Sequence, residues 1–498
     1  MQINNKNDLP VAIIGAGPVG LAAAAHLAQR NQRFVLLEAG PHIGASIMKW
    51  GHVRLFSPWR YMVDKAAHSL LAPTGWRMPD PEADPLGSEL VREYLQPLAA
   101  LPAIKPNLRL NTRVIRVARK GFDKLKTNGR ERAPFVLTLQ TEQGQTPLMA
   151  KAVIDASGTW ETPNPLGANG TWALGEQANQ DRITYGIPDV LGADRARHAG
   201  KHILVVGSGH SAFNAIIDLE HLAQQAPNTR ITWAVRREQA GQMFGGLSDD
   251  QLSQRGALGE QAQSVVARGL VKFEAGVKIE RVERIGEQVN IYGDDERVLG
   301  PFDEVIACTG FRPDLSILSE LRLKLDEQVD APVALAPLID PNVHSCGSVP
   351  PHGYEELKHP EPDVYVVGMK SYGRAPTFLM LTGYEQVRSV VAAIAGDLAA
   401  ARAVQLVLPE TGVCGGANCG TSTLAGSVSV VEGCCGAPAI KTLASFVSLD
   451  SLLTSVPVAA DVATSACCST EKQAVCCEPA EKAECCGTGN SAGSCGCK

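Results

Sequence analysis

The chain of 498 residues lacks several features that would place it in other classes of protein. It has no uninterrupted apolar run of about 18 residues, so the sequence predicts no membrane-spanning helix. Its net charge of −6 gives no general basic surface for nucleic acid. The first residues show no charged segment followed by an apolar segment and a cleavage site, so no signal peptide is predicted. We therefore expect a cytoplasmic protein that binds neither membranes nor nucleic acid.

Cysteine is scarce in most of the chain and concentrated at its end. Residues 1–400 contain Cys308 and Cys346, and the remainder of the 14 cysteines lie beyond residue 400. This last part is also rich in Gly, Ala, Ser and Thr and poor in aromatic residues, a composition typical of weakly ordered segments. The sequence therefore predicts a folded body that ends near residue 405 and a weakly ordered, cysteine-rich tail over 406–498.

The segment that begins at Val11 has the order of a dinucleotide-binding unit. A short apolar run is followed by Gly15, Gly17 and Gly20 in the pattern G-x-G-x-x-G, and then by an Ala-rich helical segment. In such a unit the first glycine allows a tight turn, the second lets a pyrophosphate approach the backbone, and the third lets the helix pack on the strand. Glu38 ends the next apolar run, about 20 residues on, where a carboxylate binds ribose hydroxyls. These residues, with Pro18, are the predicted contacts of one bound dinucleotide.

The same pattern occurs again in the middle of the chain. Gly207, Gly209 and Ala212 form G-x-G-x-x-A between an apolar run and a second helical segment. The strand after that helix leads to Arg236 and Arg237 rather than to an acid. Guanidinium groups pair with a 2′-phosphate, which a carboxylate would repel, so this site predicts NADPH. The alternative is that the two arginines belong to an ordinary solvated turn.

Two dinucleotide sites in one chain suggest that one cofactor stays bound while the other shuttles. Bound FAD at the first site and visiting NADPH at the second would place a hydride acceptor beside a hydride donor. The predicted fold is α/β, with two Rossmann-like domains and a disordered tail. We expect an FAD-binding domain over 1–165 and 331–405, with an NADPH-binding domain over 166–330 inserted into it.

In this order of motifs the chain resembles the two-dinucleotide-binding flavoproteins, which include thioredoxin-reductase-like enzymes and flavin-containing monooxygenases. VIDASGTWETPNP at 153–165 is similar to the segment that leaves the FAD domain, and EVIACTGFRPD at 304–314 to the segment that returns. The stretch 363–397 is similar to the last FAD element, a strand followed by a helix. The resemblance places Pro376 in the first turn of that helix, whose positive end would face the flavin. It implies further cofactor contacts at Gly158, Gly310, Gly368, Gly373, Pro376 and Thr377.

The chain also departs from this family pattern. Many relatives have Gly-Asp where this chain has Gly368 and Met369, so the usual carboxylate for the FAD ribityl chain is missing. Residues 1–400 contain neither C-x-x-C nor C-x₄-C, the dithiols of the disulfide reductases, and we expect Cys308 to be a core residue. The histidine-containing fingerprint of the monooxygenases before the second glycine motif has no clear match either. The resemblance therefore leaves monooxygenase and reductase activities open.

Two segments are candidates for the substrate side of the flavin. Residues 49–62 resemble, weakly, a monooxygenase segment that would form a wall of the flavin ring with Trp50 and Trp59. The loop before the last FAD strand is either a substrate or metal site, or a proline-stiffened polar surface loop. Its candidate ligands are His344, Cys346, His352 and His359.

The tail contains cysteines mostly as adjacent pairs. Adjacent Cα atoms lie about 3.8 Å apart, whereas disulfides usually need about 4.4–6.8 Å, so both thiols of a pair stay available to a soft ion. The spacing differs from that of zinc sites and resembles that of arsenic and mercury resistance proteins. Incidental binding of zinc or copper(I) by a disordered tail is the alternative. The predicted metal ligands are Cys434, Cys435, Cys467, Cys468, Cys476, Cys477, Cys485, Cys486, Cys495 and Cys497.

The sequence as a whole predicts an NADPH-dependent FAD oxidoreductase, monooxygenase-like and linked to arsenic or soft-metal detoxification. Its substrate would be a small molecule or a metalloid. The sequence assigns no catalytic residues, and the protein is a possible homodimer. One alternative is an NADPH-dependent reductase of a thiol-bound metal or disulfide that uses the tail cysteines. The other is a non-catalytic metalloid-binding protein.

Overall fold

The structure is a computed structural model that describes residues 6–238, 243–244, 253–343, 349–376 and 378–406. Contacts within the chain separate residues 1–421 from residues 422–498, so all of the described residues belong to the first of these two units. Residues 407–498 of the predicted tail, with all ten candidate metal ligands, lie outside the described residues.

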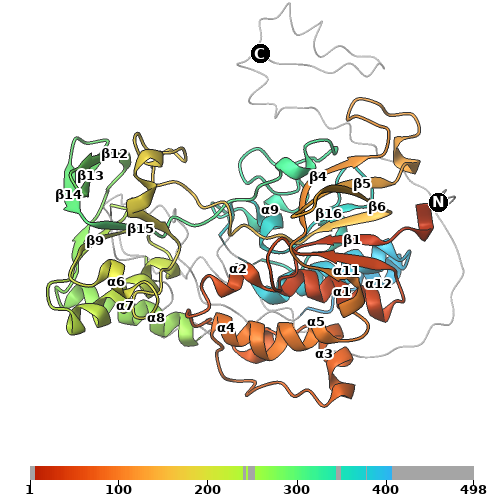
Figure 1. Cartoon of the computed structure of the whole chain (residues 1–498), viewed down its shortest axis with the longest axis horizontal. Helices are drawn as coiled ribbons and strands as arrows, with labels where there is room; N and C mark the ends of the chain where they lie inside the picture. Colours follow the sequence, from red (N-terminus) through yellow and green to blue (C-terminus); the bar gives the residue numbers. More distant parts are fainter. Residues whose placement is uncertain (1–5, 239–242, 245–252, 344–348, 377, 407–498) are drawn as a thin grey trace, which may run out of the picture. The chain divides into compact units, whose positions relative to one another are not determined.

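The first sheet is parallel and is built from both ends of the described chain (Figure 1). Its strand order is β16-β7-β1-β2-β3, so the last strand joins the sheet beside β7. The strands are β1 (Val11–Ile14), β2 (Phe34–Leu37), β3 (Leu108–Arg109), β7 (Ala152–Asp155) and β16 (Val364–Val366).

Side chains alternate between the two faces of this sheet, as the two-residue period of a strand requires. Val11 and Ile13 pack into a core formed with α1 (Pro18–Gln29) and α11 (Met380–Ile394). Ala12 and Ile14 pack into a separate core with an antiparallel sheet of three strands. Those strands are β4 (Arg113–Arg119), β5 (Phe135–Thr141) and β6 (Gly144–Ala150). This three-layered part of the chain is called the first unit below.

A second three-layered part, called the inserted unit below, lies between β7 and β16 in the sequence. Its parallel sheet has the order β11-β10-β9-β15-β8. Ile203 and Val205 face α7 (His210–Gln225) and α8 (Ser253–Ala267), whereas Leu204 and Val206 face a second three-stranded antiparallel sheet. The strands are β8 (Ile183–Tyr185), β9 (His202–Val206), β10 (Arg230–Ala234), β11 (Lys272–Glu274), β12 (Ile279–Ile285), β13 (Gln288–Gly293), β14 (Val298–Phe302) and β15 (Glu304–Ala307). The insertion of one α/β unit into another confirms the predicted fold class, while the exact domain boundaries stay a prediction.

Shorter helices connect these layers. The α-helices are α2 (Ala45–Met48), α3 (Lys65–Leu71), α4 (Gly87–Glu89), α5 (Gln96–Ala100), α6 (Arg195–His198), α9 (Ala336–Ile339), α10 (Tyr354–Leu357) and α12 (Leu398–Arg402). A π-helical turn spans Leu90–Leu95, and 3₁₀ turns span Lys6–Asp8, Trp59–Tyr61, Ala72–Thr74, Lys105–Asn107, Arg130–Arg132, Gln177–Arg182, Ser316–Leu318 and Gly368–Tyr372. In the described parts of the chain, no helix has the length and apolar character needed to cross a membrane.

One predicted helix start is wrong. Pro376 was expected in the first turn of the last FAD helix, but α11 begins at Met380 with Leu379 as its N-cap. Pro376 therefore lies in the connection between β16 and α11, and its neighbour Thr377 lies outside the described residues. A proline fits a first helical turn, but it fits a connecting segment equally well.

Candidate functional site

The first glycine loop has the shape that a dinucleotide requires. Gly15 has φ of +96°, which favours glycine, and a Cβ there would lie 2.7 Å from the carbonyl oxygen of Ala156. A Cβ on Gly20 would lie 1.9 Å from the carbonyl oxygen of Gly15, so only glycine lets α1 pack this closely on β1. A Cβ on Gly17 would meet nothing within 4 Å, so the loop is open where a pyrophosphate would approach. The N-terminus of α1 follows directly at Pro18 and offers its unpaired N–H groups to an anion.

Glu38 lies beside this loop, one residue beyond β2. Its Oε2 accepts a hydrogen bond of 2.8 Å from the N–H of Ala16, and its Oε1 accepts one of 2.8 Å from the N–H of Gly40. A carboxylate has about four lone-pair positions, so each oxygen keeps one for a further donor. This placement fits the predicted role of a ribose-binding acid.

The end of β16 is fixed by a buried hydrogen-bond network. The N–H of Gly368 donates to Oε1 of Gln386 at 2.7 Å. Nε2 of Gln386 lies 2.9 Å from Oγ of Ser371 and 2.9 Å from Nε2 of His352. Nδ1 of His352 is 3.0 Å from the carbonyl oxygen of Pro350, which fixes Nε2 as the acceptor of the Gln386 amide. His352 thus positions the turn that contains the predicted contacts Gly368 and Gly373.

The alternative of a polar surface loop is wrong for His352 and His359. Both ring nitrogens of His352 are hydrogen-bonded within the protein, whereas a ligand role of His359 stays a prediction. His352 is 3% exposed and His359 is 8% exposed. Burial lowers the pKa of both imidazoles, to about 4 for His359, so both are neutral near pH 7. His344 and Cys346 lie outside the described residues, and within the described ranges no group of three or more metal-ligating side chains occurs.

The second glycine loop repeats the geometry of the first. Gly207 has φ of +130°, and a Cβ there would lie 2.3 Å from the carbonyl oxygen of Cys308. The indole N–H of Trp233 donates to the carbonyl oxygen of Gly207 at 2.7 Å and holds the loop in place. A Cβ on Gly209 would meet nothing within 4 Å, and Ala212 is fully buried in the first turn of α7. This loop is therefore also open toward a diphosphate.

Arg236 and Arg237 are exposed just beyond the end of β10, where the sequence places them for a 2′-phosphate. Nη1 of Arg236 donates to the carbonyl oxygen of Ala168 at 3.1 Å. The carbonyl oxygen of Arg237 accepts from the N–H of Gly276 at 2.9 Å, which ties this turn to the segment after β11. Both arginines therefore lie just beyond the carboxyl end of β10.

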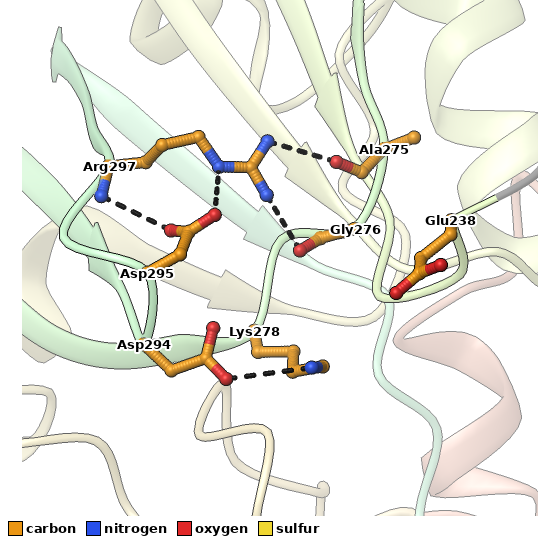
Figure 2. Close-up of a pocket in the computed structure, with 7 residues that line it drawn as sticks. All are labelled: Glu238, Ala275, Gly276, Lys278, Asp294, Asp295 and Arg297. Atoms are coloured by element: carbon orange, nitrogen blue, oxygen red, sulfur yellow. Dashed lines mark hydrogen bonds and ion pairs between the residues drawn. The ribbon is translucent and has the colours of Figure 1, made fainter.

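A polar pocket of about 440 Å³ adjoins this turn (Figure 2). Arg297 forms one wall, because its guanidinium donates to the carbonyl oxygens of Ala275 at 3.0 Å and Gly276 at 2.7 Å. Glu238 lines the same pocket directly after the arginine pair. Its remaining lining residues are Lys278, Asp294 and Asp295. With three acids against two bases, the pocket itself attracts anions less than the neighbouring arginine pair does.

The two connections between the units form a short antiparallel ribbon. The N–H of Asn164 donates to the carbonyl oxygen of Gly310 at 2.9 Å, and the hydroxyl of Thr309 donates to the carbonyl oxygen of Asn164 at 2.6 Å. Trp160 stacks on Phe311 with ring centroids 4.8 Å apart. The predicted contact Gly310 therefore lies in an ordered crossing.

Cys308 is a structural thiol. It is 6% exposed at the end of β15, and its Sγ donates to the carbonyl oxygen of Gly186 at 3.3 Å. Burial raises the pKa of the Cys308 thiol to about 12, so it remains protonated and poorly nucleophilic. The prediction that Cys308 belongs to the core is confirmed.

A family model described as pyridine nucleotide-disulphide oxidoreductase matches residues 12–335, which contain both glycine loops. The chain belongs to this family. Its members are oxidoreductases, so the predicted enzyme class is confirmed.

The proteins that this chain is similar to include reductases and a monooxygenase. The ferredoxin–NADP reductase of Nocardioides sp. (strain ATCC BAA-499 / JS614) is 25% identical over 329 residues, 66% of this chain and 81% of the relative. The solved bacillithiol disulfide reductase Bdr (YpdA) from Bacillus cereus matches with a TM-score of 0.56 and 17% identity, over 78% of this chain and 99% of its own. DfoA of Erwinia amylovora, a cadaverine monooxygenase solved with bound FAD, matches with a TM-score of 0.54 and 14% identity, over 80% and 98%. At these identities the two structures show the shared fold.

Two buried ionic clusters in the first unit were not predicted. Arg119 and Arg130 both donate to Glu361, with N–O distances of 2.8 and 2.9 Å. Lys370 pairs with Asp155 at 2.8 Å. The sequence gives little indication of these clusters. Asp155 is a charged residue at the end of an apolar strand, and Lys370 follows Gly368 and Met369. Neither signal identifies a partner more than 200 residues away.

Proposed function

We propose that this protein is an NADPH-dependent FAD oxidoreductase, with FAD along the first glycine loop and NADPH along the second. The observation that carries the proposal is the contrast between two loops of the same geometry. Glu38 lies against the first loop, and Arg236 and Arg237 stand exposed beside the second. A ribose with free hydroxyls suits the acid, and a ribose with a 2′-phosphate suits the arginines.

In this proposal the chain's own residues bind and orient the two cofactors. Gly17 and Gly209 leave the backbone open to the two diphosphates, and the N-termini of α1 and α7 supply N–H groups to them. The His352–Gln386 network holds Gly368 in its turn at the end of β16. Bound FAD would supply a hydride acceptor for NADPH.

For the second half of the reaction, we favour oxidation of a substrate with oxygen. Residues 1–400 contain no C-x-x-C or C-x₄-C dithiol, and Cys308 is buried and protonated. The described body therefore offers no thiol relay to a disulfide. In a monooxygenase reaction, NADPH supplies two electrons and the substrate two, and one oxygen atom enters the product while the other becomes water.

The finer proposal is that the substrate is a metalloid or soft metal, with trivalent arsenic as the first candidate. It rests on the vicinal cysteine pairs of the tail, because trivalent arsenic takes three sulfur ligands and thiolates favour soft ions. If arsenite is the substrate, one oxygen atom of O₂ would convert it to arsenate.

A reductase that passes electrons to an external acceptor is the second candidate. The similarity to a ferredoxin–NADP reductase and to a bacillithiol disulfide reductase favours it. In that case the tail cysteines or a separate protein would receive the electrons, because Cys308 is unsuited to do so.

Anaerobic reduction followed by oxygen separates these proposals. The purified full chain should contain FAD, and NADPH without oxygen should bleach its visible absorbance. Admitting oxygen with arsenite should then consume NADPH, oxygen and arsenite in equal amounts. Bleaching without arsenite-dependent oxygen uptake would favour the reductase, and no bleaching at all would refute the oxidoreductase proposal.

The role of the tail is tested in the full chain. Replacing the pairs at 467/468, 476/477 and 485/486 with serine should lower the arsenite stoichiometry stepwise and leave NADPH-to-flavin transfer intact. Arsenite binding should release protons, because thiols with a pKa near 8.5 must lose them to become ligands. Unchanged arsenite binding by the triple-pair variant would refute a metalloid role of these pairs.

A further inference from the structure

A buried ammonium group lies at the carboxyl ends of β7 and β16. The side chain of Lys370 is 3% exposed, and its Nζ lies 2.8 Å from Oδ2 of Asp155 and 3.0 Å from Oγ of Ser157. Asp155 is fully buried, and its Oδ1 accepts from the hydroxyl of Ser157 at 2.6 Å and from the N–H of Ser157 at 3.1 Å. Burying two ions costs several kcal/mol per ion before their attraction offsets it, so such a pair calls for a reason beyond stability.

The residues that hold this ammonium border the first glycine loop. A Cβ on Gly15 would lie 2.9 Å from the Cα of Ser157, so the end of β7 lies directly against the loop. Gly368 stands two residues before Lys370, and a Cβ there would lie 3.3 Å from the side chain of Val19 in the first turn of α1. Ligands of such sheets bind outside the carboxyl ends of the strands. The ion pair therefore lies at the wall of the crevice proposed for FAD.

The ammonium group of Lys370 has one N–H donor without a partner among the described residues. A lysine ammonium has three donors. Two of them reach Asp155 and Ser157, and no acceptor for the third occurs among the described residues. Hydrogen bonds from Ser316 lower the pKa of Asp314, and the positive charge of Lys370 lowers it further. The charge of Lys370 therefore acts beyond Asp155 and Ser157.

We propose that Lys370 is a positioning residue for the dinucleotide of the first unit. Through Ser157 and Asp155 it fixes the end of β7 against the glycine loop, and its positive charge favours the binding of a diphosphate. This inference rests on the proposed function, in which that dinucleotide is FAD.

The test compares FAD binding after removal of the positive charge, in Lys370→Met, and after removal of the negative charge, in Asp155→Asn. Apoprotein is prepared by removing the flavin, and FAD affinity is measured by titration calorimetry. Lys370→Met should weaken FAD binding at least tenfold, because it removes the positive charge and leaves the negative charge of Asp155 unpaired at the crevice wall. Asp155→Asn keeps an acceptor for Ser157 and the positive charge, so it should weaken FAD binding less than Lys370→Met does.

The double variant Lys370→Met/Asp155→Asn keeps the test decisive if the single lysine variant does not fold. It buries no unpaired charge, so it should fold. Because it lacks the positive charge, it should still bind FAD more weakly than the wild type, but less weakly than Lys370→Met alone. Arg374→Met is the matched control, because it removes an exposed cation of the same segment, paired with Asp330, and should change FAD affinity less than twofold.

Three results would overturn this inference. If Lys370→Met and Asp155→Asn weaken FAD binding alike, the pair acts only as a structural contact. If the double variant binds FAD like the wild type, the positive charge has no role in binding. If the wild-type apoprotein binds no FAD, the proposed function fails first, before any variant is compared.

Discussion

The two units have the same three layers but place their charges differently. In both, a five-stranded parallel sheet is covered by helices on one face and by a three-stranded antiparallel sheet on the other. In the first unit, Glu361 is 1% exposed and bonds to two buried arginines. In the inserted unit, the buried carboxylate of Glu304 pairs with Arg182 and Arg197, which are 23% and 37% exposed. Glu287 of this unit is 89% exposed where it pairs with Arg182. The alternation of apolar residues along the strands thus gives both units the same three layers. The units differ in where their charged side chains are buried.

The same contrast holds at the two glycine loops. Glu38 is held by two backbone N–H groups of the first unit, whereas the guanidinium groups of Arg236 and Arg237 are exposed. A carboxylate held in place suits a cofactor that stays bound, such as the proposed FAD. Exposed arginines suit a cofactor that binds and dissociates in each cycle, such as the proposed NADPH. The following predictions test this difference, from the largest expected effect to the smallest.

The largest effect is expected at the buried cluster of the first unit. Glu361→Gln removes the carboxylate that both Arg119 and Arg130 bind, so both guanidinium groups then lack their charged partner. Breaking a buried ion pair in this way costs about 3–5 kcal/mol in the free energy of unfolding. The measurement is urea unfolding of the holoprotein.

Glu287→Gln in the inserted unit is the control, because its carboxylate is exposed and its loss should change the urea midpoint little. Equal effects of the two substitutions would show that burial of charge does not distinguish the units.

The next effect concerns cofactor choice in the inserted unit. Arg236→Ala and Arg237→Ala should each weaken NADPH binding by about 1.5–3 kcal/mol, the usual strength of one hydrogen bond to a charged group. NADH has no 2′-phosphate, so its binding should change much less. Arg230→Ala is the control, because Arg230 is exposed at the opposite end of β10. A wild-type enzyme that already prefers NADH would contradict the role assigned to the arginine pair.

A smaller effect is expected from acid. The pKa of His359 is lowered to about 4 by burial, against about 6.5 in the unfolded chain. The unfolded state therefore binds the proton first, so stability is complete above pH 6.5 and is lost as the pH falls toward 4. This single histidine should lower the free energy of unfolding by about 2 kcal/mol at pH 5.

His359→Asn tests this effect, because asparagine keeps an acceptor for the N–H of Lys324 but cannot take up the proton. The loss of stability between pH 7.5 and pH 5 should shrink by about that amount. His221→Asn, at an exposed position of α7, is the control. An unchanged pH dependence in His359→Asn would argue against a buried neutral imidazole.

The smallest effect is expected from removing the tail. A chain of residues 1–406 keeps both glycine loops and the hydrogen bond of Gln405, whose N–H donates to Glu385 at 3.1 Å. It should therefore bind FAD and oxidise NADPH as the full chain does, with no measurable change in flavin content. Loss of flavin on truncation would show that residues beyond 406 support the first unit.

Elements defined by neighbours in the sequence were predicted well. β1 and β9 coincide with the two apolar runs predicted before the glycine motifs, because each is short and ends at a glycine. The burial of Cys308 followed from its place at the end of an apolar strand. The start of α11 was missed, because a proline marks a helix start only when the following residues continue the helix.

The sequence by itself determined the order of strands, glycines and helices and the charge that follows each second strand, because these features rest on contacts between residues close along the chain. Only the tertiary structure decided which charges are buried together. Lys370 meets Asp155 across 215 residues, and Arg119 meets Glu361 across 242. Such pairs form when two strand ends or loops meet in space, and no local pattern encodes that meeting. The same holds for His352 and His359, which look polar in the sequence and are neutral inside the fold because other segments exclude water from them.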